Sequence, residues 1–190
     1  MKYILPIVFY FITIFSIQSQ SPGLVVQTGV TSSFSKDKNI TLAGEGHYGW
    51  MVGADARLLE GDLYFIIGLQ YHQTNLKSIS KINFFSENDW KLIVGRAGLG
   101  FNILRINEKL SLRSKIIGSV NFVSDAPENA LNKVGYTFIN DSFLGAATGL
   151  GLTIGSFDID VEYQYGIINA YKEQPKSTFD IWTLMAGFHF

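Results

Sequence analysis

Hydrophobic and polar residues alternate strictly along residues 157–165. The odd-numbered positions carry large apolar or aromatic side chains, and the even-numbered positions carry acidic or amide side chains. Because successive side chains of a β-strand point to opposite faces, this segment predicts a strand with one apolar and one charged face. A similar alternation closes the sequence over residues 182–190, where the even positions are apolar.

The same periodicity, interrupted by Gly, Pro and polar clusters, predicts eight strands. We expect them at residues 24–34, 47–58, 62–76, 90–104, 109–124, 142–155, 156–171 and 178–190. Long polar loops are expected at residues 35–46, 77–89, 125–141 and 172–177, and tight turns at residues 59–61, 105–108 and 155–156. Four long connections at one end and three tight turns at the other predict an all-β, antiparallel up-and-down barrel. Both termini then lie at the tight-turn end.

Such a barrel can be assembled in two ways. A soluble barrel encloses the apolar face, whereas a transmembrane barrel turns that face to lipid and encloses the polar face. The polar face carries Gln27, Asp55, Arg57, Gln70, His72, Arg96, Arg113, Lys115, Asn121, Asp158, Asp160, Glu162 and Gln164.

Glycine placement favours the transmembrane arrangement, because small residues make room where a narrow interior must hold long side chains. The tight turn at residues 155–156 is expected to place Gly151 opposite Asp160 and Gly149 opposite Glu162. The glycines expected on or near the polar face are Gly49, Gly53, Gly68, Gly95, Gly98, Gly100, Gly118, Gly145, Gly149, Gly151, Gly166 and Gly187.

The charges and the aromatic residues also favour the transmembrane arrangement. The polar face balances Asp55, Asp158, Asp160 and Glu162 against Arg57, Arg96, Arg113 and Lys115, as an enclosed interior requires. Aromatic residues of the apolar face lie toward the strand ends, as two interfacial girdles would. The expected girdles are Phe34, Trp50, Tyr71, Phe122, Tyr171 and Trp182 near the long loops, and Phe65, Phe101, Phe157, Phe188 and Phe190 near the turns.

The N-terminal residues 1–19 have the features of a cleaved secretory signal peptide, which leaves residues 20–190 for the barrel. Lys2 precedes an apolar run too short for a membrane-spanning helix, which needs about 20 apolar residues. The chain has no Cys, which excludes disulfides, thiolate metal sites and a Cys-linked lipid anchor. Its formal net charge of −1 argues against nucleic acid as a partner.

The export signal, the eight-strand rhythm and the terminal Gly187-Phe188-His189-Phe190 resemble the small outer-membrane β-barrel domain proteins of Bacteroidota, which are similar to OmpA/OmpX-type barrels. The resemblance covers essentially the whole chain after the signal. It implies an integral protein of the Gram-negative cell envelope, with periplasmic termini and extracellular long loops. It also implies that the barrel-insertion machinery reads the C-terminal strand. The family shares no catalytic set, so the resemblance implies neither an enzyme nor a cofactor.

The lumenal charges allow two interpretations. They could form a proton or ion path, or they could be a structural salt-bridge network that fills the interior. We favour the network, since eight strands enclose a space just wide enough for side chains. The groups concerned are Asp158, Asp160, Glu162, Arg96, Arg113 and Lys115.

His47 and His72 are expected to face inward on neighbouring strands near the long loops. Such a pair could bind a metal ion or respond to pH, with a third ligand from Glu45, Glu87 or Asp89. Two hydrogen-bonded histidines in a wet vestibule are the simpler interpretation, and we assign no metal ion.

Three functions stay open. The first is a non-enzymatic barrel that acts structurally, binds through surface loops, or serves as a small subunit of a larger outer-membrane complex. The second is a lipid-modifying enzyme, for which Ser33 with His47, or His189, are weak candidates. The third is a soluble barrel for a hydrophobic ligand. The expected contact surface is the loop at residues 125–141, with Pro127 and an apolar stretch at residues 134–139.

Overall fold

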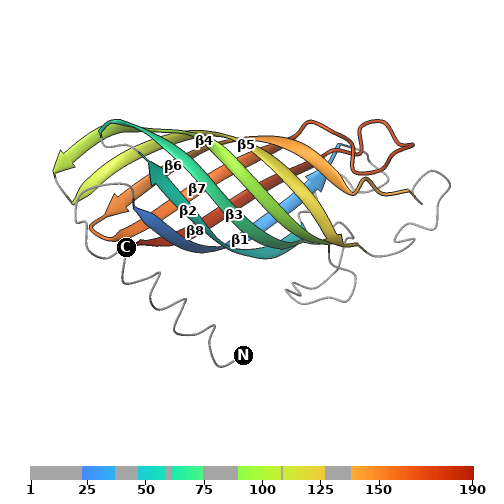
Figure 1. Ribbon diagram of the computed structural model, residues 1–190, viewed down its shortest axis with the longest axis horizontal. Coiled ribbons are helices and arrows are strands. Elements are labelled where there is room, and N and C mark those ends of the chain that lie inside the picture. Colours follow the sequence, from blue (N-terminus) through green and yellow to red (C-terminus); the bar gives the residue numbers. More distant parts are fainter. Residues whose placement is uncertain (1–22, 37–46, 59–60, 75–89, 108, 127–137) are drawn as a thin grey trace, which may run out of the picture.

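The described part of the chain is one closed antiparallel barrel (Figure 1). The computed structural model describes residues 23–36, 47–58, 61–74, 90–107, 109–126 and 138–190. The strands follow one another around the barrel in sequence order, and β8 pairs with β1. They are β1 (Leu24–Ser35), β2 (His47–Leu58), β3 (Leu63–Thr74), β4 (Trp90–Asn107), β5 (Leu110–Asp125), β6 (Ser142–Ile154), β7 (Phe157–Gly166) and β8 (Phe179–His189).

The eight-stranded up-and-down barrel predicted from the alternation is therefore confirmed. The proposed signal peptide at residues 1–19 lies outside the described residues. No helix in the described segments is long and apolar enough to cross a membrane.

The polar face is the inside of the barrel. Arg96 is only 6% exposed and Glu162 only 5%, whereas Leu69 on the opposite face is 65% exposed. All the other charged residues predicted for the polar face of the strands are also buried or nearly so. A soluble barrel would show the reverse, because apolar side chains avoid water. The glycines and the balanced charges predicted that the barrel encloses its polar face, and this prediction is confirmed.

A two-residue turn fixes the register of β6 and β7. Gly155 has a φ of 62°, a left-handed conformation that L side chains rarely adopt, and it begins the return to β7. The pairing that results places Gly151 opposite Asp160 and Gly149 opposite Glu162, as expected from the sequence.

Not every predicted glycine faces the lumen. Gly95 and Gly118 alternate with the inward residues Arg96 and Ser119, and they therefore lie on the outer face. The prediction that Gly95 and Gly118 lie on or near the lumenal face is wrong. Side-chain direction alternates along a strand, and the neighbouring Arg96 and Ser119 point inward.

The strand ends differ from the prediction in two places. β4 continues through Arg105 to Asn107, so the turn expected at residues 105–108 is shorter, and irregularities in the β4–β5 register accommodate the extra length. β7 ends at Gly166 rather than at residue 171, because the Asp180 carboxylate accepts the Gly166 backbone N–H at 2.9 Å. The chain beyond Gly166 does not extend the strand, and its residues Ala170 and Tyr171 join a buried cluster with Trp90 and Phe179.

Aromatic residues pair on the outer surface at both ends. Trp50 and Tyr71 lie 5.4 Å apart, between ring centroids, toward the long loops, while Phe157 and Phe188 lie 5.1 Å apart toward the tight turns. Tyr171 is an exception to the predicted girdles. It is only 2% exposed, because the segment after Gly166 turns inward and carries the ring with it.

Candidate functional site

A continuous chain of ion pairs runs through the lumen. β7 supplies its acidic side with Asp158, Asp160 and Glu162, which fall at alternate positions and all point inward. The cationic partners come from β2, β4 and β5. Because these strands are not neighbours of β7 in the sheet, the ion pairs connect walls of the barrel that no backbone hydrogen bonds connect.

The middle of this network is centred on Glu162. Arg96 Nη2 donates to Glu162 Oε1 at 2.7 Å, and Arg96 Nε lies 3.5 Å from Asp55 Oδ1. Lys115 also contacts Glu162, and its Nζ lies 3.5 Å from Asp160 Oδ2. Arg113 Nη2 then reaches Asp160 Oδ1 at 3.0 Å.

Asp158 anchors the network at the tight-turn end. Arg113 Nη2 lies 3.0 Å from its Oδ1, and Arg57 Nη2 lies 2.5 Å from its Oδ2. His189 Nε2 lies 2.5 Å from the same Oδ2, and the Thr153 hydroxyl donates to Oδ1 at 2.7 Å. Sequence analysis missed His189 and Thr153 as members. The alternation of the last strand contained the signal for His189, because odd positions there face inward.

All eight charged residues predicted for the lumen are thus brought together, each with an oppositely charged partner. Seven of their side chains are at most 7% exposed, and Arg57 is 14% exposed. Buried charges are tolerated when they are paired and hydrogen-bonded. The ion pairs therefore hold separate walls of the barrel together across the lumen. Each of the eight charged residues already has an oppositely charged partner.

An aromatic cap closes the lumen at the long-loop end. Trp90 packs against Phe179 and Tyr171, with ring centroids 4.9 and 5.8 Å away, and Phe143 stacks on Phe179 at 5.3 Å. We call the whole buried cluster the aromatic cap; its members are Trp90, Leu92, Val94, Phe143, Ala170, Tyr171 and Phe179.

Next to the cap, two segments form a small loop platform, which we define as residues 138–140 and 167–178; its buried residues Ala170 and Tyr171 also belong to the cap. Ile139 and Tyr171 form an antiparallel bridge. The Asn140 N–H donates to Ala170 O at 2.8 Å, and the Lys172 N–H donates to Phe138 O at 2.9 Å. Phe138 is nevertheless 57% exposed. The platform is therefore an ordered surface that presents an apolar side chain outward.

Lys36 and Tyr165 interact where β1 ends. Lys36 Nζ lies 3.8 Å from the centroid of the Tyr165 ring. Its hydrogen bond to Tyr165 raises the pKa of the Lys36 ammonium, which keeps that group charged. The loop end of the barrel thus also carries a fixed cation.

The two histidines expected to form a pair are not directly opposite each other. The register places His72 opposite Met51 and His47 opposite Ser33. His72 is buried, as expected, and its Nε2 bonds Gln70 Oε1 at 2.8 Å. The His47 side chain and the proposed ligands Glu45, Glu87 and Asp89 lie outside the described residues. Among those described, no group of three or more His, Asp or Glu side chains could hold a metal ion.

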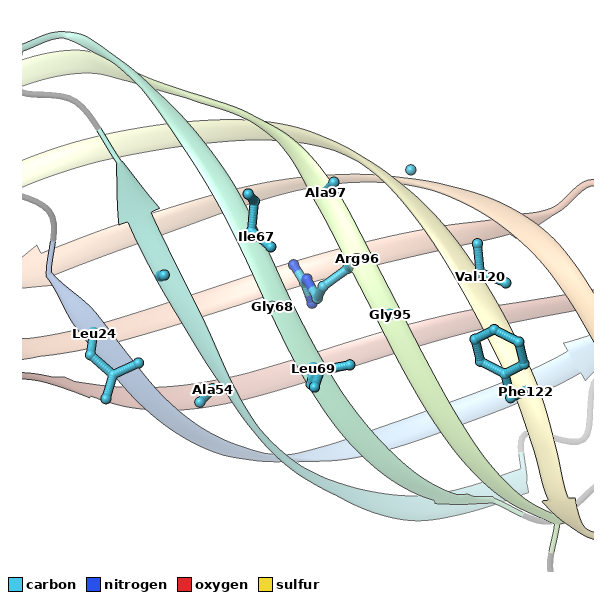
Figure 2. Close-up of a pocket in the computed structure, with 12 residues that line it drawn as sticks. Leu24, Ala54, Ile67, Gly68, Leu69, Gly95, Arg96, Ala97, Val120 and Phe122 are labelled. Carbon is cyan, nitrogen blue, oxygen red and sulfur yellow. The ribbon is translucent and has the colours of Figure 1, made fainter. Parts of the chain in front are cut away.

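An open depression of about 650 Å³ lies on the outer surface (Figure 2). Its residues come from β1 to β5, and Arg96 is the only charged one among them. Small residues line much of the depression: Ala54, Ala56, Gly68, Gly95, Ala97 and Gly118. The larger apolar residues that line it are Leu24, Ile67, Leu69, Val120 and Phe122.

Comparison with solved structures defines the class of this fold. Neisserial surface protein A (NspA) aligns over 88% of this chain and 95% of its own, with a TM-score of 0.58 and 15% identity. Ail, the attachment invasion locus protein of Yersinia pestis, solved with the heparin analogue sucrose octasulfate, aligns over 90% of this chain and 100% of its own, with a TM-score of 0.47 and 19% identity. The closed barrel and the NspA alignment show that the chain has the fold of an eight-stranded outer-membrane β-barrel. No family model matches it, and no curated protein matches it.

Proposed function

We propose that this chain is an integral protein of a bacterial outer membrane, with a plugged polar lumen, that acts through its long-loop end. In this proposal it belongs to the OmpA/OmpX-like barrels of the Bacteroidota type. Its termini lie in the periplasm, and it binds a partner or joins a larger envelope complex through the loop platform. It has no catalytic activity.

One observation carries the proposal: the barrel encloses its charges and exposes its apolar side chains. Ile67 and Ile116, near the middle of their strands, are 55% and 62% exposed. Each large apolar side chain left in water costs about 1.5–3 kcal/mol relative to burial, so a continuous exterior of them requires a hydrocarbon surrounding. The aromatic pairs at both ends fit the two interfaces of such a layer.

Two features favour a binding role over an enzymatic one. The His189 ring nitrogen Nε2, which a hydrolase would need as a base, is engaged by Asp158 and Arg57 within the charge network. The loop platform, by contrast, holds exposed Phe138, Ile167 and Ile168 on an ordered backbone. Ordered loops with exposed apolar residues on a rigid barrel are suited to recognition.

Membrane fractionation tests the location. We expect the protein in the outer-membrane fraction, released only by detergent, and migrating differently on gels before and after heating. Recovery of the folded protein from the periplasm without detergent would contradict the proposal.

Site-specific photocrosslinking in intact cells tests the working surface. A photoreactive phenylalanine analogue at Phe138 should capture a discrete protein partner. The matched control is the same analogue at Phe157, an exposed aromatic residue on the outer face near the tight turns. Equal capture at both positions, or none at Phe138 in a correctly located protein, would argue against a platform interface.

A further inference from the structure

The last residues of β4 form an edge of the sheet that its neighbour β3 does not cover. The ladder between β3 and β4 ends where Leu63 pairs with Phe101. One more bond follows on that side, from the Asn102 N–H to Asp62 O at 2.7 Å. Over residues 103–107, which we call the free edge, β4 pairs with β5 alone among the described residues, and it projects at the tight-turn end (Figure 1). Such an edge presents unpaired backbone N–H and C=O groups.

The neighbouring turn at the same end of the barrel is bonded on both of its sides. The Gly155 N–H donates to Lys109 O at 2.6 Å, and the His189 N–H donates to Ser156 O at 2.9 Å. The turn between β6 and β7 is thus held by β8 on one side and by the residue before β5 on the other. The free edge is therefore a particular feature of β4, and not the way in which this barrel ends its hairpins in general.

The free edge carries apolar side chains that the barrel leaves exposed. Ile103, Leu104 and Ile106 are 55%, 53% and 59% exposed. The register with β5 is irregular at Ile103 and again at Ile106, and bulges of this kind redirect the side chains of the extra residues. Lys, Pro or a covering segment commonly protects an exposed edge. Here the only charged residue is Arg105, whose Nη2 lies 3.2 Å from Asp62 Oδ1.

Lipid does not cover the whole of the free edge in a transmembrane barrel. Ile93 on the same strand pairs with Tyr71 and Phe122, which belong to the aromatic girdle near the long loops. A barrel strand rises about 3.3 Å per residue and is tilted by about 35–45°, so about ten residues cross an apolar band about 25 Å tall. Counted from Ile93, the band ends near Ile103. Residues 104–107 therefore lie in the aqueous phase, where their apolar side chains contact water unless a partner covers them.

The backbone of the free edge selects an extended polypeptide as the partner. An added strand satisfies a row of unpaired N–H and C=O groups together, and the side chains beside that row select apolar residues on it. Geometry excludes the same edge of a second copy. Two barrels in one membrane, related by an axis along its normal, would bring their β4 strands together at twice the tilt, roughly 70–90°. Adjacent strands of a sheet differ by only about 20–25°.

We propose that residues 103–107 bind an extended segment of a soluble partner protein by strand addition, with Ile103, Leu104 and Ile106 contacting apolar side chains of that segment. The bound segment continues the sheet at the point where β3 ends. The inference rests on the proposed outer-membrane location and orientation, which make the partner periplasmic. It concerns the end of the barrel opposite the loop platform, so the two interfaces are tested separately.

Site-specific photocrosslinking in intact cells tests the free edge at single-residue resolution. A photoreactive phenylalanine analogue is placed at Ile103, Leu104 or Ile106, one position per variant, and mass spectrometry identifies the crosslinked partner residues. Strand addition predicts that all three positions crosslink to one segment of one periplasmic protein, at residues that follow one another in order along that segment. Ile106→Lys should remove most of the capture from position 103, because a charge then protects the edge.

The matched control is the analogue at Ile154, an exposed apolar residue at the same end of the barrel whose strand is paired on both sides. It should give no ordered set of crosslinks to a protein segment. Capture of no protein at the three edge positions would overturn the inference, as would crosslinks only to a second copy or to unrelated segments without order. Membrane fractionation and impermeant labelling of Ser156→Cys are measured separately, so a wrong location or orientation is distinguished from an edge that binds nothing.

Discussion

Asp160 lies directly opposite Gly151 in the β6–β7 ladder, and its carboxylate fills the space above the glycine. A Cβ on Gly151 would collide with Asp160 Oδ1 and lie 2.9 Å from Arg113 Nη2. The glycine is therefore required by the ion pair that crosses above it. In this barrel, glycine placement and charge placement are two parts of one packing arrangement.

Gly151→Ala should destabilise the barrel by about 1–3 kcal/mol, the usual range for overpacking a filled interior. Gly118→Ala is the matched control on the neighbouring strand β5, where the nearest atom to an added Cβ is Ala97 O at 3.8 Å. It should be neutral or slightly stabilising, since alanine loses less backbone entropy than glycine. Urea unfolding in lipid vesicles, followed by Trp fluorescence, measures both. Equal changes in unfolding free energy for the two variants would show that the side chains around Gly151 move aside for the added methyl group.

Removing one partner of the lumenal network should cost more than removing an exposed ion pair. Arg96→Met leaves Glu162 and Asp55 without their shared cation, so we expect a loss of about 3–5 kcal/mol in unfolding free energy. Glu162→Leu should cost a similar amount, and the double variant less than the sum of the two, because it leaves fewer charges unpaired.

The control is Arg105→Met, which removes an ion pair with Asp62 whose side chains are 54% and 79% exposed. Its cost should stay below about 1 kcal/mol. A loss at Arg96 as small as that at Arg105 would mean that water replaces the lumenal cation easily.

The alternation of side chains was sufficient to predict both faces of the barrel. It placed Asp158, Asp160 and Glu162 inside, and it placed them opposite glycines in the correct register, because side-chain direction in a strand has a period of two. The individual ion pairs were not predictable. β7 and β4 are distant in the sheet, and only the diameter and shear of the closed barrel bring Glu162 to Arg96.

The end of β7 was predicted five residues too late. Residues 167–171 keep residues that favour strands, such as Ile167 and Tyr171, but the alternation breaks at Ile168 and Asn169. The strand nevertheless ends at Gly166, where a side chain fourteen residues away, Asp180, accepts the backbone N–H. The bridge between Ile139 and Tyr171 then holds the following segment over the lumen. Both contacts are tertiary, and no local pattern encodes them.

The filled lumen should not conduct ions. The aromatic cap closes the long-loop end, and the charge network braces the interior below it. We expect no stable single-channel currents from the purified protein in planar bilayers. Trp90→Ala should lower stability by about 3–5 kcal/mol, as expected for a buried aromatic residue, yet still give no stable pore, since the charge network is unchanged. Reproducible steps from the wild-type protein would contradict a plugged lumen.

The orientation of the barrel can be tested with cysteine labelling, because the chain contains no native Cys. Lys172→Cys places a thiol on the exposed loop platform, and Ser156→Cys places one in the exposed turn between β6 and β7. On intact cells, a membrane-impermeant maleimide should label position 172 and not position 156. After the outer membrane is permeabilised, both should react, since both positions are solvent-exposed in the folded barrel. Labelling at 156 alone in intact cells would reverse the topology, and the loop platform would then face the periplasm.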